Sequence, residues 1–175
     1  MAGTMQTSTQ SLVDSLEDGR RQLLAAVSGL ADDAAAVRPA ADRWSVLECL
    51  EHLVLVEHRF LEFARTGETR ETARVDPARE QSLADAMLDR SARRQAPEAV
   101  VPAGRFHSIV EVLAAFNDAR DTSVRFVRDQ GDKLYTVKAA HPRFGELNGM
   151  EVMHLANGHA LRHVAQIRET REAVQ

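Results

Sequence analysis

The fold is decided by a helical segment near the C-terminus, residues 148–167, which reads NGMEVMHLANGHALRHVAQI. Asn148 is a candidate N-cap, and Glu151 three residues later completes the capping-box pattern. Apolar residues then recur at helical spacing and mark one buried face: Val152, Leu155, Ala156, Ala160 and Ile167. The segment predicts a long amphipathic helix that continues almost to the C-terminus.

The same signals predict three further long helices. Ser-x-x-Glu capping boxes open one helix over residues 45–67 and another over residues 108–131. Apolar residues at helical spacing predict the first helix, from about residue 8 or 11 to residue 29. Between the second and third long helices the chain crosses over, with a shorter helix that begins at Asp76-Pro77 and ends near Arg93.

Four long helices with one long crossover predict an all-α protein, a four-helix bundle formed by residues 1–175 as a single domain. No segment of suitable length alternates apolar and polar residues, with residues 134–137 as the nearest exception, so a sheet is not supported. Functional sites in such bundles are usually built from side chains that project into the core.

Composition excludes several classes of protein. The 175 residues include 44% hydrophobic and 27% charged residues, which is typical of a globular domain. The net charge of −4 gives no electrostatic basis for binding nucleic acid or an anionic membrane. The N-terminus has no leader pattern, and the one cysteine, Cys49, cannot form an internal disulfide. We therefore expect a soluble, cytoplasmic protein whose partner is a small-molecule substrate.

Two histidines, His159 and His163, lie four residues apart in the C-terminal helix. Their rings project from one face about one turn apart, a spacing that suits a single metal ion. The same arc holds the apolar residues, so both imidazoles take positions that a bundle normally fills with leucine, and burying them requires a reason. A metal site is one explanation. The other is that each histidine forms hydrogen bonds within the core or lies near an open end of the bundle.

A catalytic metal site usually has three protein ligands and one open position. His52, near the middle of the helix over residues 45–67, is the leading candidate for a third imidazole. It falls at the edge of that helix's apolar arc, so periodicity alone does not select it.

Two motifs together resemble a known family. The first is Trp44-Ser45-x-x-Glu48-x-x-x-His52-Leu53, and the second is His159-x-x-x-His163-x-x-Gln166-Ile167. With the intervening segments they resemble the DinB/YfiT-like superfamily of small four-helix metal proteins, over residues 44–167.

The resemblance implies a divalent metal ion, usually zinc or nickel, held by His52, His159 and His163. Three neutral imidazoles leave the ion's double charge uncompensated, which lowers the pKa of a bound water and lets the ion polarise a substrate or hold a thiolate. Similar proteins include transferases that use a low-molecular-weight thiol as co-substrate and proteins described as metal-dependent hydrolases. We expect an enzyme of one of these two reaction classes.

Other residues near the motifs have competing explanations. Gln166, one turn beyond His163, is a candidate to orient a ligand ring or the bound water. Glu48 is a candidate base, but its capping role already explains it. Arg120 and Arg162 are candidates to recognise an anion, although arginine is the commonest charge in this chain and we expect each to lie at the surface.

The remaining histidines and the cysteine are not placed in the site. His141 lies in the loop before the last helix, His154 lies on a different face of that helix from the HxxxH pair, and His58 and His107 belong to no constellation. Cys49 is expected to be a small buried residue rather than a nucleophile.

A non-catalytic function is the alternative: a stress-related module that binds a metal or another ligand. A structural metal would predict a fourth protein ligand that closes the coordination sphere.

A homodimer is also expected, because the helix over residues 45–67 carries apolar residues around much of its circumference.

Overall fold

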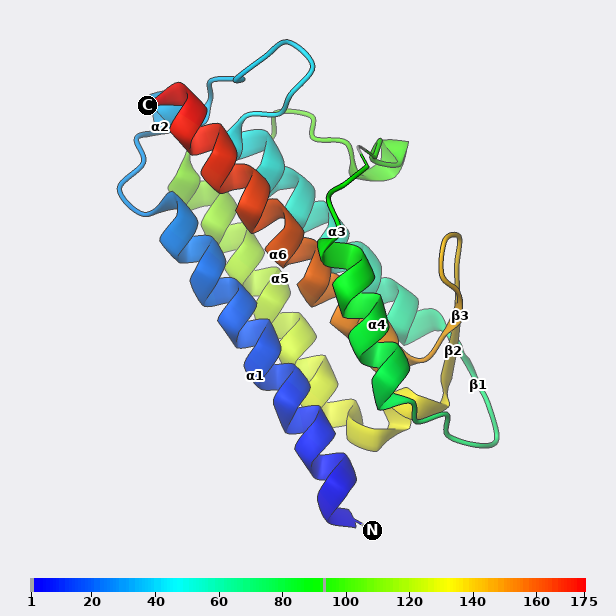
Figure 1. The fold of residues 1–175 in the computed structure, drawn as a ribbon. Helices are drawn as coiled ribbons and strands as arrows, with labels where there is room; N and C mark the ends of the chain where they lie inside the picture. Colours follow the sequence, from blue (N-terminus) through cyan, green and yellow to red (C-terminus); the bar gives the residue numbers. More distant parts are fainter. Residues whose placement is uncertain (1, 93) are drawn as a thin grey trace.

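The computed structural model describes residues 2–92 and 94–175, with side chains described from residue 8 onward. Four long helices form its body (Figure 1): α1 (Ala2–Val27), α3 (Val46–Thr66), α5 (Ile109–Gln130) and α6 (Gly149–Val174). Shorter helical segments connect them: α2 (Asp32–Ala35), α4 (Pro77–Leu88), and the 3-10 helices η1 (Glu98–Val100) and η2 (Gly131–Thr136). The predicted all-α bundle is confirmed.

Three of the long helices begin where the capping residues predict. Ser45 and Asn148 each accept a hydrogen bond from the backbone N–H of the glutamate three residues later, and that glutamate accepts one from the N–H of the cap. Ser108 caps α5 in the same way, but the carboxylate of Glu111 accepts from the backbone N–H one residue before the cap. These local bonds satisfy N–H groups that a helix start otherwise leaves without partners.

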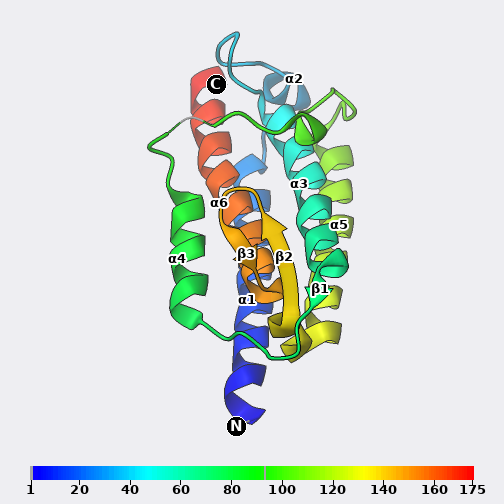
Figure 2. The same ribbon diagram turned by 90° about the vertical axis from the view of Figure 1, so that its right-hand side faces the viewer.

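The direction of the helices explains the long crossover. Helices α1 and α6 run one way along the bundle, and α3 and α5 run the other way (Figure 1). Each helix packs against two neighbours, so that α1, α6, α3 and α5 follow one another around the bundle. Because α3 and α5 are parallel, the chain between them must return along the bundle, and Figure 2 shows it doing so with α4 beside α6.

A buried polar layer divides the core into two apolar clusters. One cluster includes Leu16 and Phe60, and the other includes Leu23 and Phe116. Between them lie three buried polar side chains from three different helices: Glu57, Arg120 and Asn157.

A small antiparallel sheet, which the sequence did not predict, lies against the side of the bundle, beside α3 and α6 (Figure 2). Its strands are β1 (Glu68–Thr69), β2 (Val137–His141) and β3 (Gly145–Leu147), in the order β1-β2-β3. The expectation that no sheet forms is therefore wrong. The strands are too short to show an alternating pattern. Residues 134–137 came nearest to such a pattern, but the first three of them lie in η2 instead of a strand.

The crossover helix begins as predicted and ends early. Asp76 caps α4 by accepting a hydrogen bond from the N–H of Arg79, with Pro77 in the first turn. The helix stops at Leu88, and the predicted end near Arg93 lies outside the described residues.

Within the described part of the chain, none of the helices combines the length and the apolar composition that a membrane span requires. The apolar residues of α3 that suggested a dimer, residues 53–63, are largely packed inside this chain. The homodimer stays a prediction.

Candidate metal centre

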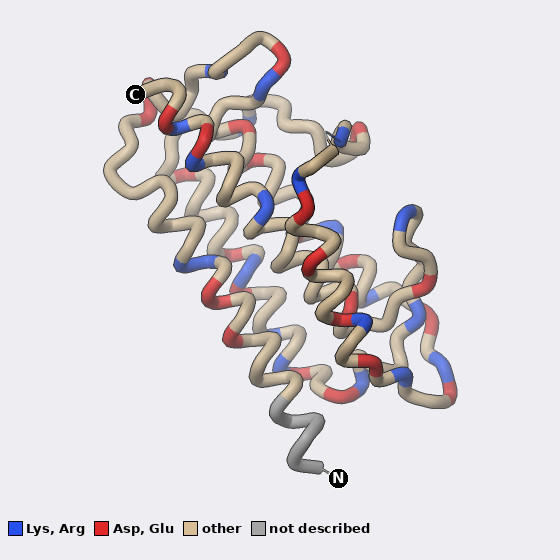
Figure 3. Tube along the Cα trace, viewed as in Figure 1, with Lys and Arg blue, Asp and Glu red and all other residues tan. Residues whose placement is uncertain are grey.

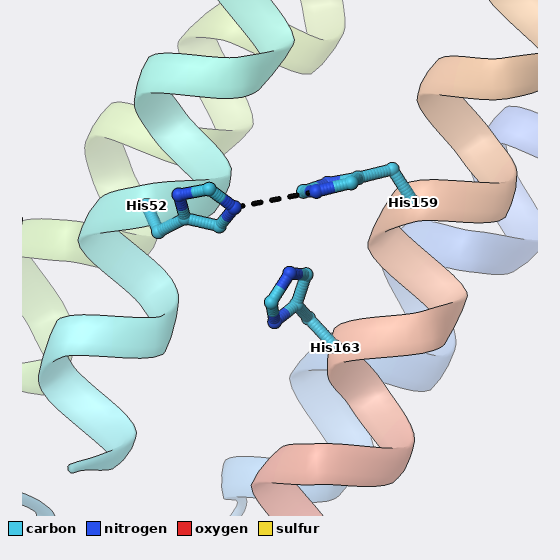
Figure 4. Close-up of side chains that lie close together, drawn as sticks. All are labelled: His52, His159 and His163. Carbon is cyan, nitrogen blue, oxygen red and sulfur yellow. Dashed lines mark hydrogen bonds between the residues drawn. The ribbon is translucent and has the colours of Figure 1, made fainter. Parts of the chain in front are cut away.

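Three histidines from two helices converge on one point. His52 extends from α3, and His159 and His163 extend from α6 toward it (Figure 4). One ring nitrogen from each lies within 4.8 Å of the others. In the described residues no cysteine, carboxylate or fourth histidine joins this group. The structure thus brings together the three residues that the sequence analysis singled out.

A backbone carbonyl fixes the orientation of His52. Its Nδ1 lies 2.7 Å from the carbonyl oxygen of Val100, at the end of η1. A carbonyl can only accept, so Nδ1 carries the proton and Nε2 presents a lone pair. That lone pair points at Nε2 of His159, 3.2 Å away.

The neighbouring side chain of Glu51 holds the loop that supplies this carbonyl. Glu51 is buried, and its two carboxylate oxygens accept hydrogen bonds from three consecutive backbone N–H groups, at residues 103–105. Glu51 therefore anchors the crossover, and the next residue of α3, His52, donates a hydrogen bond to it. Such an arrangement is typical of groups that orient metal ligands.

All three rings are neutral near neutral pH. Burial lowers the pKa of His163 to about 3, with the nearby His52 adding to the effect. Burial also lowers the pKa of His159 well below its usual value, and His163 contributes further. For His52, burial lowers the pKa while the hydrogen bond to Val100 opposes the shift. Neutral imidazole is the form that binds a metal ion.

The converging nitrogens fit a cation. Nitrogen lone pairs repel each other unless a proton or a cation lies between them, and here Nε2 of His52 lies 3.2 Å from Nε2 of His159. One ring nitrogen of His163 lies within 4.8 Å of this pair. Three neutral imidazoles that converge in this way match the donor set of a zinc-type site.

Trp44 packs against the cluster. Its ring centroid lies 4.9 Å from that of His52 and 6.3 Å from that of His163, nearly parallel to the latter. The residue was predicted to anchor the start of α3, and it also shields the two imidazoles.

The histidines lie on the wall of a cavity of about 1460 Å³. The walls come from α3, α6, the end of α4, the crossover and the β2–β3 turn. Part of the wall is apolar: Val56, Phe60, Phe63, Met87 and Phe144. A further part is basic: Arg43, Arg59, Arg90, Arg94, Arg143 and Arg162. Such a volume accommodates a small organic molecule beside the histidines.

The supporting residues fall into two groups. Gln166 lines the cavity and interacts with His163, where its hydrogen bond opposes the fall in the pKa of that ring. Glu48 is occupied elsewhere, because it completes the cap of α3 and pairs with Arg38. Its capping role is confirmed.

Other predicted assignments also agree with the structure. His154 faces away from the cluster and lies 3.5 Å from Glu80 of α4. Cys49 is buried, and burial raises the pKa of its thiol to about 12, so it is no nucleophile.

The expected surface position of Arg120 is wrong. Its side chain is fully buried and paired with Glu57 in the polar layer of the core. Helical spacing cannot reveal this, because the partner comes from another helix. Arg162 is half-buried, and its guanidinium bonds backbone carbonyls at and beyond the end of α4, including that of Asp89.

Sequence reasoning missed His141. It ends β2, lines the cavity, and packs its ring 6.4 Å from Phe60 and 5.1 Å from Phe144. The backbone N–H groups of residues 143 and 144 donate to its Nδ1. Only the hairpin that β2 forms with β3 brings His141 to the cavity, and no pattern in the sequence predicted that hairpin.

Fold and site together define a four-helix bundle with a full-length crossover and a three-histidine cluster in a cavity. A family model described as the DinB superfamily matches residues 15–167. The chain belongs to this superfamily, and the resemblance inferred from its motifs is confirmed.

The known proteins that are similar to the chain include YuaE, YfiT and TT2238. The uncharacterized protein YuaE of Bacillus subtilis (strain 168) is 24% identical over 149 residues, which cover 85% of this chain and 90% of YuaE. The structure of YfiT from Bacillus subtilis, described as a probable metal-dependent hydrolase with an unusual four-helix bundle topology, matches with a TM-score of 0.63 at 17% identity, covering 94% of this chain and 86% of YfiT. The four-helix bundle protein TT2238 matches with a TM-score of 0.57 at 22% identity, covering 92% and 98% of the two chains. These structural matches support the fold.

Proposed function

We propose that this protein is a metal-dependent hydrolase in which His52, His159 and His163 hold one divalent ion, with zinc or nickel as the expected metals. The observation that carries the proposal is the convergence of three neutral imidazoles at a cavity, with no fourth protein ligand among the described residues. A structural zinc site is normally closed by four protein ligands, whereas a catalytic site keeps a position for substrate or water. The open arrangement favours the enzyme over the purely structural module.

A divalent ion at this place would supply a Lewis acid and lower the pKa of a water molecule. The chain's own residues hold the three histidine rings in position. Val100 holds the proton of His52 on Nδ1, so that Nε2 stays available, and Trp44 restricts the movement of two rings. Gln166 steadies His163 from the cavity side. The description of YfiT as a probable metal-dependent hydrolase agrees with this chemistry.

Metal content is the first test. Tag-free protein should carry about one equivalent of zinc or nickel by elemental mass spectrometry, or take it up when the salt is added. Each of His52→Ala, His159→Ala and His163→Ala should lose the ion while keeping the helical circular dichroism spectrum. His58→Ala is the matched control, because His58 is exposed and outside the cluster. Wild-type protein that binds neither metal would overturn the proposal.

Reaction class is the second test. The metal-loaded protein and its His163→Ala variant should be compared on a panel of small amides and esters, with and without a low-molecular-weight thiol. We expect metal-dependent hydrolysis that does not require the thiol. Turnover only in the presence of the thiol would reassign the site to transferase chemistry.

A further inference from the structure

The cavity that holds the histidines is strongly basic. Six arginine side chains line it, against two carboxylates, Asp42 and Glu98. In Figure 3 the tip of the β2–β3 hairpin and the segment that leaves α4 both carry blue. The excess of positive charge is notable in a chain whose net charge is −4.

Three of the six arginines have structural roles. Arg43 and Arg90 both contact the carboxylate of Glu169, Arg90 through two hydrogen bonds of 2.6 and 2.7 Å. Arg162 is held by backbone carbonyls at and beyond the end of α4. These contacts explain the presence of Arg43, Arg90 and Arg162 without a ligand.

The other three arginines have no such partner. Arg59, Arg94 and Arg143 come from α3, from the crossover and from the β2–β3 turn, and none pairs with a carboxylate in the described part of the chain. All three are exposed. Burial and the charge of Arg94 both lower the pKa of Arg143, and the carboxylate of Asp89 opposes them. Asp89 also acts on Arg94. Three distant parts of the chain thus deliver positive charge to the same cavity, with Asp89 as a nearby counter-charge.

Aromatic side chains connect this basic region to the histidines. The guanidinium of Arg143 lies 4.5 Å from the ring centroid of Phe144, which packs on His141. Phe60 lies between His141 and His159, 6.4 and 6.1 Å from their ring centroids. A ligand that reaches from the arginines to the histidines therefore passes along an apolar, aromatic wall.

We propose that Arg59, Arg94 and Arg143 bind an anionic group of the substrate, a carboxylate or a phosphate, whose apolar body lies along Phe60 and Phe144. The site would thus take amphiphilic small-molecule anions, with the anionic group and the reacting group at opposite ends. Anion binding stands on the arginines alone, while the placement of the reacting end at the histidines rests on the proposed hydrolase function. Guanidinium groups suit both anions, because their planar fork donates two parallel hydrogen bonds.

Binding of probe molecules to the full chain without metal tests the proposal. The metal is removed because the carboxylate of a probe could otherwise bind the ion at the histidines instead of the arginines. The probes are 4-phenylbutyrate, 3-phenylpropylphosphonate and the neutral 4-phenylbutyramide, measured by calorimetry or chemical-shift titration. We expect at least one anion to bind about tenfold more tightly than the amide, and the preference to shrink as salt is added. The stronger of the two anions identifies the preferred group.

The double variant Arg94→Gln/Arg143→Gln should lose that preference, and adding Arg59→Gln should remove any remainder. These side chains are exposed, so the thermal melt should be unchanged. Arg128→Gln is the matched control, because it removes the same charge from an exposed position of α5 outside the cavity. Equal binding of anions and amide, or a double variant that keeps the preference, would overturn the proposal.

The outcomes separate this proposal from the hydrolase proposal. If the probes behave as expected but no metal-loaded preparation hydrolyses any substrate, the anion site stands and the hydrolase assignment fails. If metal-loaded protein hydrolyses esters but the metal-free protein binds neither anion more tightly than the amide, the hydrolase stands and the anion proposal fails.

Discussion

Replacing Arg120 with methionine should destabilise the fold strongly. The side chain is fully buried, and its Nε and Nη2 each lie 2.9 Å from an oxygen of Glu57. Its Nη1 donates to the carbonyl of Leu16 at 2.8 Å and to the side chain of Asn157 at 3.2 Å. The variant would leave the carboxylate of Glu57 buried without a counter-charge.

The size of the effect follows from that buried charge. Removing one partner of a buried ion pair costs about 3–5 kcal/mol, because the remaining charge loses its compensation. Methionine fills much of the arginine volume, so the cavity contribution stays small. For a protein of this length each kcal/mol lowers the melting temperature by roughly 2–4 °C, so the melting temperature should fall by roughly 6–20 °C.

Urea unfolding followed by circular dichroism measures the free energy directly. The double variant Glu57→Leu/Arg120→Met should recover most of the loss, because an apolar pair of similar volume replaces a buried ion pair at little cost. Arg128→Met, at an exposed position, should change stability by less than about 0.5 kcal/mol. A loss below about 1 kcal/mol for Arg120→Met, or a double variant as unstable as the sum of both single variants, would refute the reasoning.

Three further outcomes are expected. Glu51→Ala removes the acceptor of three backbone N–H groups, so the loop that carries Val100 should be cleaved faster in limited proteolysis and zinc affinity should fall by about tenfold; an unchanged digest and titration would contradict this. For the metal-free protein, the free energy of unfolding should fall as pH drops below 6.5, because unfolded His163 takes up a proton while the folded ring, with its pKa of about 3, does not. In urea unfolding, His163→Leu should reduce the slope of this free energy against pH by about 1.4 kcal/mol per pH unit. An unchanged slope would show that His163 titrates normally. The thiol of Cys49 should resist alkylation in folded protein and react fully in urea. Rapid labelling without urea would mean that the core around Cys49 opens in the folded protein.

The parts of the structure that local sequence determines were predictable. The caps at Ser45, Ser108 and Asn148 place three helix starts because capping involves residues only three positions apart. The pairing of His159 with His163 follows from helical geometry in the same way. Such signals need no knowledge of the rest of the fold.

Features that depend on contacts between distant segments were not predictable. His52 sits at the edge of its apolar arc, and only the family resemblance selected it from the sequence. The ion pair between Arg120 and Glu57 joins α5 to α3, and neither helix alone indicates it. Arg94 and Arg143 reach the cavity from the crossover and the β2–β3 turn, whose conformations follow from long-range packing rather than from local propensity.

The histidine cluster joins positions that lie far apart along the chain. His52 and His159 are separated by 107 residues, yet their Nε2 atoms lie 3.2 Å apart. An ion held by both would act as a reversible cross-link that closes a loop of this length, and in the simple polymer model such a closure removes about 4–5 kcal/mol of conformational entropy from the unfolded chain. The ion would then hold α3 and α6 together as firmly as a disulfide would, in a chain that has a single cysteine. Metal supply in the cell would therefore change the stability of the fold as well as the fraction of the protein that is active.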